Sequence, residues 1–178
     1  MNSEQFTKQR ILDEATKLVH LKGFRATSLQ ELLAAVGITK GSLYYYFPGK
    51  DDLGLAVLER AKKRFLATLD ELLAAPTPAQ SLEQFFDFVL NKHRSERFAG
   101  GCLFGNTALE MSDVNSRFAE SVAELFQEWI GRLAKVIRAG QAAGQFRADI
   151  PAEDLAEVIV STIEGGSCRR DFKRMNAR

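Results

Sequence analysis

The apolar residues of this chain recur every three or four positions almost from end to end, and this spacing constrains the fold most. In residues 11–19, the apolar side chains of Ile11, Ala15, Leu18 and Val19 share one face of a helix. No apolar–polar alternation is long enough for a strand, and we find no internal repeat or low-complexity tract. The sequence therefore predicts an all-α protein.

Capping and turn residues divide the first part of the chain into short helices. Residues 28–31 read Ser-Leu-Gln-Glu, a capping box that predicts a second helix beginning at Ser28 and ending at Gly37. Thr39 then caps a third helix that extends to about Tyr46 and stops before Pro48. Two short helices joined by a few residues that include a glycine form a helix-turn-helix.

Longer helices are predicted for the remainder. They cover residues 50–74, 78–94, 104–111 and 116–143, and a last helix begins at Pro151. In the helix of residues 78–94, five side chains are predicted to face inward: Leu82, Phe85, Phe86, Val89 and Leu90. After residue 166 the sequence becomes basic, so that helix either ends early, before a mobile basic tail, or offers a shortened dimer seam.

Composition narrows the class of protein. The chain has 178 residues, 46% hydrophobic and 26% charged, and no apolar run approaches the ~18 to 20 residues that span a bilayer. The first residues, MNSEQFTKQR, have no apolar stretch after their charges and are not expected to be a secretory signal. The two cysteines form neither a metal-binding spacing nor a disulfide framework. We therefore expect a cytoplasmic protein without metal or cofactor.

Charge is spread unevenly between the two parts of the chain. Residues 1–64 carry 11 basic and 7 acidic side chains, a balance of +4, whereas residues 65–178 carry 13 and 16, a balance of −3. A basic front is consistent with a polyanionic partner, and equally with chance variation on a solvated surface.

An unusual aromatic run lies in the third helix and its flanks, TKGSLYYYFPGKDDL. At ~100° per residue, Leu43 and Phe47 face the same way and are expected to pack inward. Tyr44 and Tyr45 then point outward, and Tyr46 is intermediate. The alternative is a small aromatic core cluster beside one solvated lysine.

An outward face of lysine, serine and tyrosine hydroxyl groups suits DNA, because the start of a recognition helix reaches base edges in the major groove. Gly41 allows a close approach, while Ser42 and Lys40 offer donors to bases or phosphates. Tyrosine hydroxyls and Lys50 are expected to bind phosphates, as are Thr27 and Ser28 at the start of the second helix.

The same residues carry a resemblance to a known family. The order helix, GF-x-x-TS, helix, VGITKGSLYYYFPGKDDL resembles the DNA-binding domain of TetR-type (TetR/AcrR) bacterial transcriptional regulators over roughly residues 7–57. Tyr46 departs from the histidine often found at its position. The matching positions are Gly23-Phe24, Thr27-Ser28, Val36-Gly37, Lys40-Gly41, Leu43-Tyr44-Tyr45, Phe47-Pro48 and Lys50.

This resemblance implies a three-helix DNA-binding head in residues 1–49 and a helical effector-binding and dimerisation body in residues 50–178. The protein would be a homodimeric repressor that a small molecule releases from its operator. The rivals are an effector-independent architectural DNA-binding protein and a helical enzyme with an incidental helix-turn-helix. No catalytic constellation is visible for the enzyme. By resemblance the DNA-facing positions are Thr27, Ser28, Lys40, Gly41, Ser42, Tyr44, Tyr45, Tyr46 and Lys50.

The body offers weaker signals. Asn106 and Glu110 are four residues apart on a short helix, where they either orient a polar ligand group, cap the helix or face water. Cys102 is either a thiol that senses electrophiles or oxidants, or a small structural residue. A ligand cavity would draw on large aromatics that could equally be plain core. The candidates are Phe86, Phe104, Phe118, Phe126 and Trp129.

Overall fold

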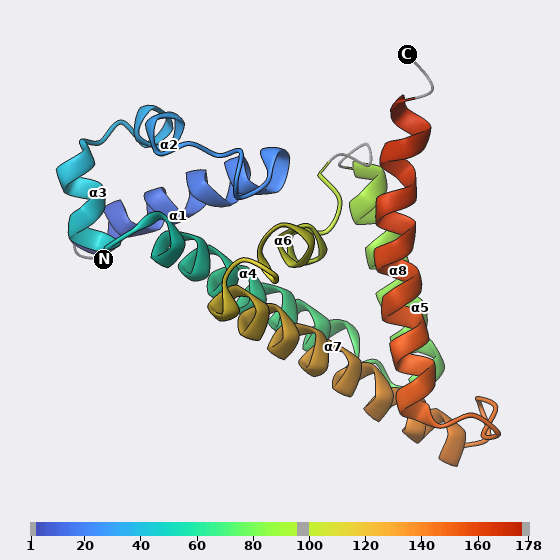
Figure 1. Cartoon of the computed structure of the whole chain (residues 1–178). Coiled ribbons are helices and arrows are strands. Elements are labelled where there is room, and N and C mark those ends of the chain that lie inside the picture. Colours follow the sequence, from blue (N-terminus) through green and yellow to red (C-terminus); the bar gives the residue numbers. More distant parts are fainter. Residues whose placement is uncertain (1–2, 96–99, 176–178) are drawn as a thin grey trace. The chain divides into compact units, whose positions relative to one another are not determined.

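The computed structural model describes residues 3–95 and 100–175, with side chains as far as Ser167. The described residues form eight helices and no strand, which confirms the all-α prediction (Figure 1). The helices are α1 (Ser3–Lys22), α2 (Leu29–Val36), α3 (Lys40–Tyr46), α4 (Lys50–Leu72), α5 (Pro78–Ser95), α6 (Leu103–Met111), α7 (Ser116–Ala142) and α8 (Ala152–Met175).

The chain divides into two compact units that do not follow a single cut in the sequence. The first comprises residues 1–62 and 102–122, and the second comprises residues 63–101 and 123–178. Helices α4 and α7 each contribute one part to either unit. The predicted boundary at residue 49 remains a prediction, and the helix-turn-helix shares the first unit with α6.

A cluster of apolar side chains holds the first three helices together. Ile11 from α1, Val36 from α2 and Leu43 from α3 are each at most 2% exposed, and Phe47 is 4% exposed in the same cluster. Leu53 and Val57 add the first turns of α4. The inward packing predicted for Leu43 and Phe47 is therefore confirmed.

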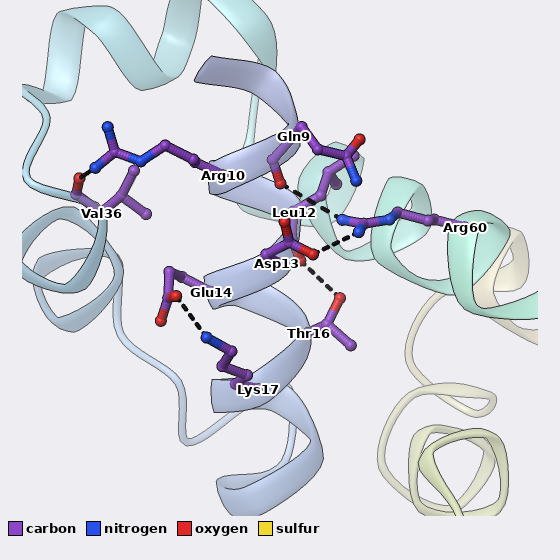
Figure 2. Close-up of polar contacts among 9 residues, drawn as sticks. All are labelled: Gln9, Arg10, Leu12, Asp13, Glu14, Thr16, Lys17, Val36 and Arg60. Atoms are coloured by element: carbon purple, nitrogen blue, oxygen red, sulfur yellow. Dashed lines mark hydrogen bonds and ion pairs between the residues drawn. The ribbon is translucent and has the colours of Figure 1, made fainter. Parts of the chain in front are cut away.

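Two arginines add polar links around α1, which Figure 2 shows in close-up. The Arg10 guanidinium donates to the backbone oxygen of Val36, at 2.7 Å, where α2 ends. From α4, Arg60 donates to the Asp13 carboxylate at 2.5 Å. Because α1 is bonded both to the end of α2 and to α4, it holds the helix-turn-helix in a fixed position relative to these two helices.

A second contact region in this unit joins the α1–α2 turn to the start of α7. The rings of Phe24 and Phe118 lie with their centroids 4.9 Å apart. Gly54 on α4 lies beside them, and a Cβ atom there would come within 2.3 Å of the Phe24 ring and 2.9 Å of the Phe118 ring. The absence of a side chain at residue 54 is thus what lets the two rings meet over α4.

The second unit is built on buried aromatic residues. Trp129 of α7 packs its ring against Phe65 of α4, with centroids 4.8 Å apart, and the fully buried Phe85 of α5 has its ring centroid 6.3 Å from that of Trp129. Arg132 of α7 also pairs with Asp70 of α4 at 2.8 Å. These contacts hold α4, α5 and α7 of the unit together.

One face of α5 differs from the prediction. Phe86 and Leu90 are 38% and 42% exposed instead of facing inward, whereas Phe85 is buried as predicted and Leu82 and Val89 are half-buried. In Figure 1, α5 and α8 lie side by side, and Val158 of α8 is 61% exposed. The two helices therefore present apolar side chains to a shared groove.

The sequence left two alternatives for the basic segment after residue 166: an early end of the last helix before a mobile tail, or a shortened dimer seam. The helix continues through Met175, so it does not end early. The structure describes side chains only as far as Ser167, which leaves out the basic ones on which that expectation rested: Arg169, Arg170, Lys173, Arg174 and Arg178.

We expect Gly54→Ala to destabilise the protein. Overpacking costs about 1–3 kcal/mol, whereas alanine gains about 1 kcal/mol over glycine in a helix. Gly131→Ala is the matched control, since a Cβ at this α7 position meets nothing within 4 Å. Urea unfolding should show Gly54→Ala less stable than wild type and Gly131→Ala more stable. Equal stability of the two variants would contradict the close packing over Gly54.

Candidate nucleic-acid interface

The second helix begins with a complete capping box. The Ser28 hydroxyl accepts from the Glu31 backbone N–H at 3.1 Å, and the Glu31 carboxylate accepts from the Ser28 backbone N–H at 3.0 Å. At the other end, Gly37 has a φ of 73°, a left-handed conformation that suits glycine. Both predicted ends of α2 are confirmed, and its N-terminus lies on an exposed surface.

Lys22 of α1 pairs with Glu31, so the capping carboxylate also ties α1 to α2. The hydrogen bond from Lys22 and those from Ser28 lower the pKa of Glu31 from 4.5 to about 2. The carboxylate is therefore ionised throughout the physiological range.

The third helix shows the predicted division of its aromatic run. Thr39 caps it, because its hydroxyl accepts from the Ser42 backbone N–H at 3.2 Å. With Leu43 buried inside, Tyr44 and Tyr45 are 40% and 71% exposed, and Tyr46 is half-buried. A small core cluster of tyrosines is thus excluded for Tyr44 and Tyr45.

The outer face of α3 collects polar groups beside these rings. Lys40 and Gly41 are exposed and Ser42 is half-buried. The Lys40 ammonium lies 5.7 Å from the centre of the Tyr44 ring. The Tyr45 hydroxyl donates to the Glu4 carboxylate at 2.8 Å, which raises the pKa of Tyr45. This face thus offers an ammonium group and hydroxyl groups to a partner.

The two predicted contacts before α2 differ in exposure. Ser28 is exposed, whereas Thr27 is only 5% exposed and its hydroxyl donates to the Gly23 backbone oxygen at 2.8 Å. The Thr27 hydroxyl therefore stabilises the turn in this structure.

Lys50 is half-buried at the start of α4. Its ammonium group donates to the Arg25 backbone oxygen at 3.2 Å and lies 4.8 Å from the centre of the Phe24 ring. Since an ammonium group has three N–H donors, one bond to Arg25 leaves donors for a phosphate.

Three polar residues of this unit did not emerge from sequence reasoning as parts of the surface. Glu4 bonds Tyr45, Arg25 is exposed on the α1–α2 turn, and the Glu110 carboxylate accepts from the Arg25 backbone N–H at 3.0 Å. The sequence left three roles open for Glu110: orienting a ligand, capping the helix or facing water. The structure shows a fourth, a hydrogen bond to the α1–α2 turn. No local signal predicts a bond between residues 85 positions apart.

The five aromatic pocket candidates fall in both compact units. Phe104 and Phe118 are buried in the first. In the second, Trp129 is 3% exposed and stacks on Phe126, with centroids 6.2 Å apart. The indole N–H of Trp129 has no hydrogen-bond acceptor among the described residues. Phe86 lines the groove between α5 and α8, which has a volume of about 440 Å³.

Cys102 is half-buried at the N-cap position of α6, where its backbone oxygen accepts from the Asn106 N–H at 2.9 Å. The side chain makes no capping hydrogen bond. Within residues 3–95 and 100–175, no cluster of histidine, cysteine, aspartate or glutamate has the arrangement to hold a metal ion. Nor does any described helix combine the length and apolar character needed to cross a membrane.

Two family models match the chain. The model described as bacterial regulatory proteins of the tetR family matches residues 11–57. The model described as the tetracyclin repressor-like C-terminal domain matches residues 78–178. Together they cover both the helix-turn-helix and most of the body.

Curated relatives agree with these matches. The HTH-type transcriptional repressor DhaR of Mycobacterium sp. (strain GP1) is 25% identical over 169 residues, which cover 94% of this chain and 83% of the relative. The transcriptional regulator AcuR of Cereibacter sphaeroides is 33% identical over 156 residues, which cover 85% of this chain and 71% of the relative.

Solved structures show the same fold. The regulatory protein TetR from Rhodobacter sphaeroides superposes with a TM-score of 0.86 at 29% identity. The superposition covers 93% of this chain and 88% of the Rhodobacter chain. A TetR transcriptional regulator from Chloroflexus aurantiacus gives a TM-score of 0.87 at 27% identity, covering 98% and 88%.

Fold, exposed third helix and relatives together define a helix-turn-helix transcriptional regulator that binds DNA. The chain belongs to the TetR family of bacterial regulatory proteins, as the resemblance over roughly residues 7–57 predicted.

The capping box should make the stability of the head depend on pH. A carboxyl group whose pKa is lowered by folding stabilises the folded state above its unfolded pKa and loses this effect as pH falls. We therefore expect the stability difference between wild type and Glu31→Gln to be full above pH 4.5 and to vanish toward about pH 2. Urea unfolding across this range measures it. The exposed Glu83→Gln serves as control, and an equal pH dependence of both variants would contradict the role of Glu31.

Proposed function

We propose that this regulator is a homodimeric repressor that a small-molecule effector releases from its operator. The observation that carries the proposal is the outer face of α3, where Tyr44 and Tyr45 are exposed while Leu43 and Phe47 hold the helix in the core. A recognition helix needs this combination of a fixed inner face and a polar outer face. Relatives such as DhaR are named as repressors, which supports repression rather than activation.

In this proposal the start of α3 reads bases, and the flanking groups bind phosphates. Lys40 and Ser42 provide donors to base edges, and Gly41 permits close approach of the backbone. The phosphate contacts come from Ser28, Lys50 and the tyrosine hydroxyls, which set the register on the duplex. Both the hydroxyl and the backbone N–H of Thr27 donate to the Gly23 backbone oxygen, so Thr27 belongs to the set through its position in the turn. The proposed set is Thr27, Ser28, Lys40, Gly41, Ser42, Tyr44, Tyr45, Tyr46 and Lys50.

Lys50→Ala should weaken binding to all DNA sequences and lower the slope of log affinity against log salt by about one unit, as for a lost phosphate contact. Lys40→Ala and Ser42→Ala should instead change which sequence is preferred. Selection from a random DNA library, followed by titrations at several salt concentrations, separates these effects. Lys135→Ala, an exposed cation of α7, is the control. An unchanged affinity of Lys50→Ala across salt would contradict the proposed orientation.

The effector site is proposed among the aromatic side chains of the body. Trp129 supports this, because a buried N–H without an acceptor costs about 1–3 kcal/mol and a ligand oxygen would recover that loss. Phe126 stacks on Trp129 in the same unit and is the candidate to test first. Phe86 lines the groove that we assign below to a second copy, and Phe104 and Phe118 lie in the other unit. A small, largely apolar molecule with one hydrogen-bond acceptor fits this chemistry.

Release from the operator requires that effector and DNA weaken each other's binding equally, because linkage is reciprocal. A compound found by thermal shift should bind about 5- to 150-fold more weakly when operator is present. The chain has a single tryptophan, so fluorescence of Trp129 provides the titration signal. Equal affinity with and without operator would show that the compound is not the regulatory signal.

We propose that a second copy covers the groove between α5 and α8. Phe86, Leu90 and Val158 are its exposed apolar side chains, whereas α7 exposes no large apolar residue. A dimer would place two heads on half-sites one helical turn, ~34–36 Å, or a multiple apart.

Val158→Arg should shift the protein toward monomer in sedimentation at micromolar concentration and weaken operator binding. Gln84→Arg, an exposed change on α5 that does not line the groove, should leave the dimer intact. A wild-type protein that sediments as a monomer and still binds a single half-site tightly would contradict the dimer.

We also infer a cytoplasmic protein without catalytic activity of its own. Bacterial DNA lies in the cytoplasm, and the family consists of regulators. Purified protein should therefore bind operator without any added metal or cofactor.

A further inference from the structure

The carboxylate of Glu110 reaches the turn between α1 and α2 within the first compact unit. One oxygen accepts from the Arg25 backbone N–H at 3.0 Å. Glu110 stands in the last turn of α6 and is half-buried. The bond therefore ties the body segment of this unit to the loop that leads into the helix-turn-helix.

Gly23 leaves the space that this carboxylate occupies. A Cβ atom at residue 23 would lie 2.0 Å from the other Glu110 oxygen, and the φ of Gly23 is 87°. Any side chain here would both strain the backbone and displace the carboxylate. The Glu110 carboxylate therefore packs directly against the backbone of the turn, in space that only a glycine at residue 23 leaves open.

The peptide groups of Arg25 are held from both sides. Glu110 accepts from its N–H, and the Lys50 ammonium donates to its backbone oxygen at 3.2 Å. The buried Thr27 hydroxyl closes the turn on Gly23. An anionic and a cationic side chain therefore fix the backbone of one residue.

The Arg25 side chain is exposed on this fixed backbone, three residues before the exposed N-cap residue Ser28. A guanidinium group binds phosphate oxygens in a bidentate manner. At the start of α2 the N–H groups of Ser28 and Glu31 are bonded within the capping box, so the Arg25 guanidinium supplies the donors at this turn. The arrangement suits a phosphate of the DNA backbone.

Other polar contacts of the α6–α7 segment reach α4 instead of the turn. Asn115 donates to Asp51 at 3.0 Å, and Arg117 donates to Asp52 at 2.9 Å. They hold the segment in place without touching Arg25. Glu110 therefore has a separate task, which can be removed without removing the other contacts.

We propose that Glu110 is a positioning residue for DNA binding, which fixes the α1–α2 turn so that Arg25 contacts a backbone phosphate. The inference rests on the DNA-facing surface proposed above. It runs against simple electrostatics, because removing a carboxylate near DNA should by charge alone strengthen binding. If Glu110 positions Arg25, its removal weakens DNA binding; if it acts only through its negative charge, its removal strengthens DNA binding.

A double-mutant cycle on operator affinity tests the proposal. Glu110→Ala should weaken binding about tenfold, as for a lost charge-assisted hydrogen bond, and lower the salt slope toward that of Arg25→Gln. In the Arg25→Gln background the same change should cost less than about twofold, because the positioned side chain is already absent. Glu110→Gln keeps an acceptor and should lose about threefold or less.

Asp113→Ala is the matched control, since it removes an exposed carboxylate three residues away and should not weaken binding. Helicity and urea unfolding establish that each variant is folded, and Glu110→Gln replaces Glu110→Ala in the cycle if the latter is not. The proposal is overturned if Glu110→Ala binds as tightly as Asp113→Ala, or if its cost is the same in both backgrounds. A wild-type protein that prefers no DNA sequence would instead reject the proposed function.

Discussion

The burial of two side chains, one within a short helix and one at its C-cap, is the constraint on which the rest of the head depends. Helix α3 has only seven residues, and a helix of that length is unstable alone in water. Leu43 and Phe47 anchor it in the cluster formed with Ile11 and Val36. Because both anchors lie on one side, the rotation of α3 about its axis is fixed, and Tyr44 and Tyr45 have only the solvent side available.

The surrounding contacts extend this rigidity to the residues on either side of α3. Arg10 bonds the last carbonyl of α2, and Arg60 ties α1 to α4. Glu110 and Lys50 hold the turn before α2 through the backbone of Arg25. A DNA-binding surface assembled this way is preorganised, so binding needs to order few backbone groups.

Local chemistry explains what the sequence could predict. Helix ends follow from caps such as Ser28 and from the glycine at residue 37, and the facing of α3 follows from 3.6-residue periodicity. Long-range contacts escaped prediction, since nothing near Glu110 indicates a partner 85 residues earlier. The outward position of Phe86 escaped it too, because two adjacent phenylalanines give no sign of which is buried. Effector and operator identity depend on side-chain geometry that helical periodicity does not encode.

Photocrosslinking tests the central claim, that the outer face of α3 contacts DNA, most directly. Operator DNA in which bromouracil replaces thymine is irradiated in complex with the protein, and the attached peptides are identified by mass spectrometry. The account predicts crosslinks within residues 39–47, which contain the exposed Tyr44 and Tyr45. Crosslinks confined to residues 78–178, with none in α3, would contradict it.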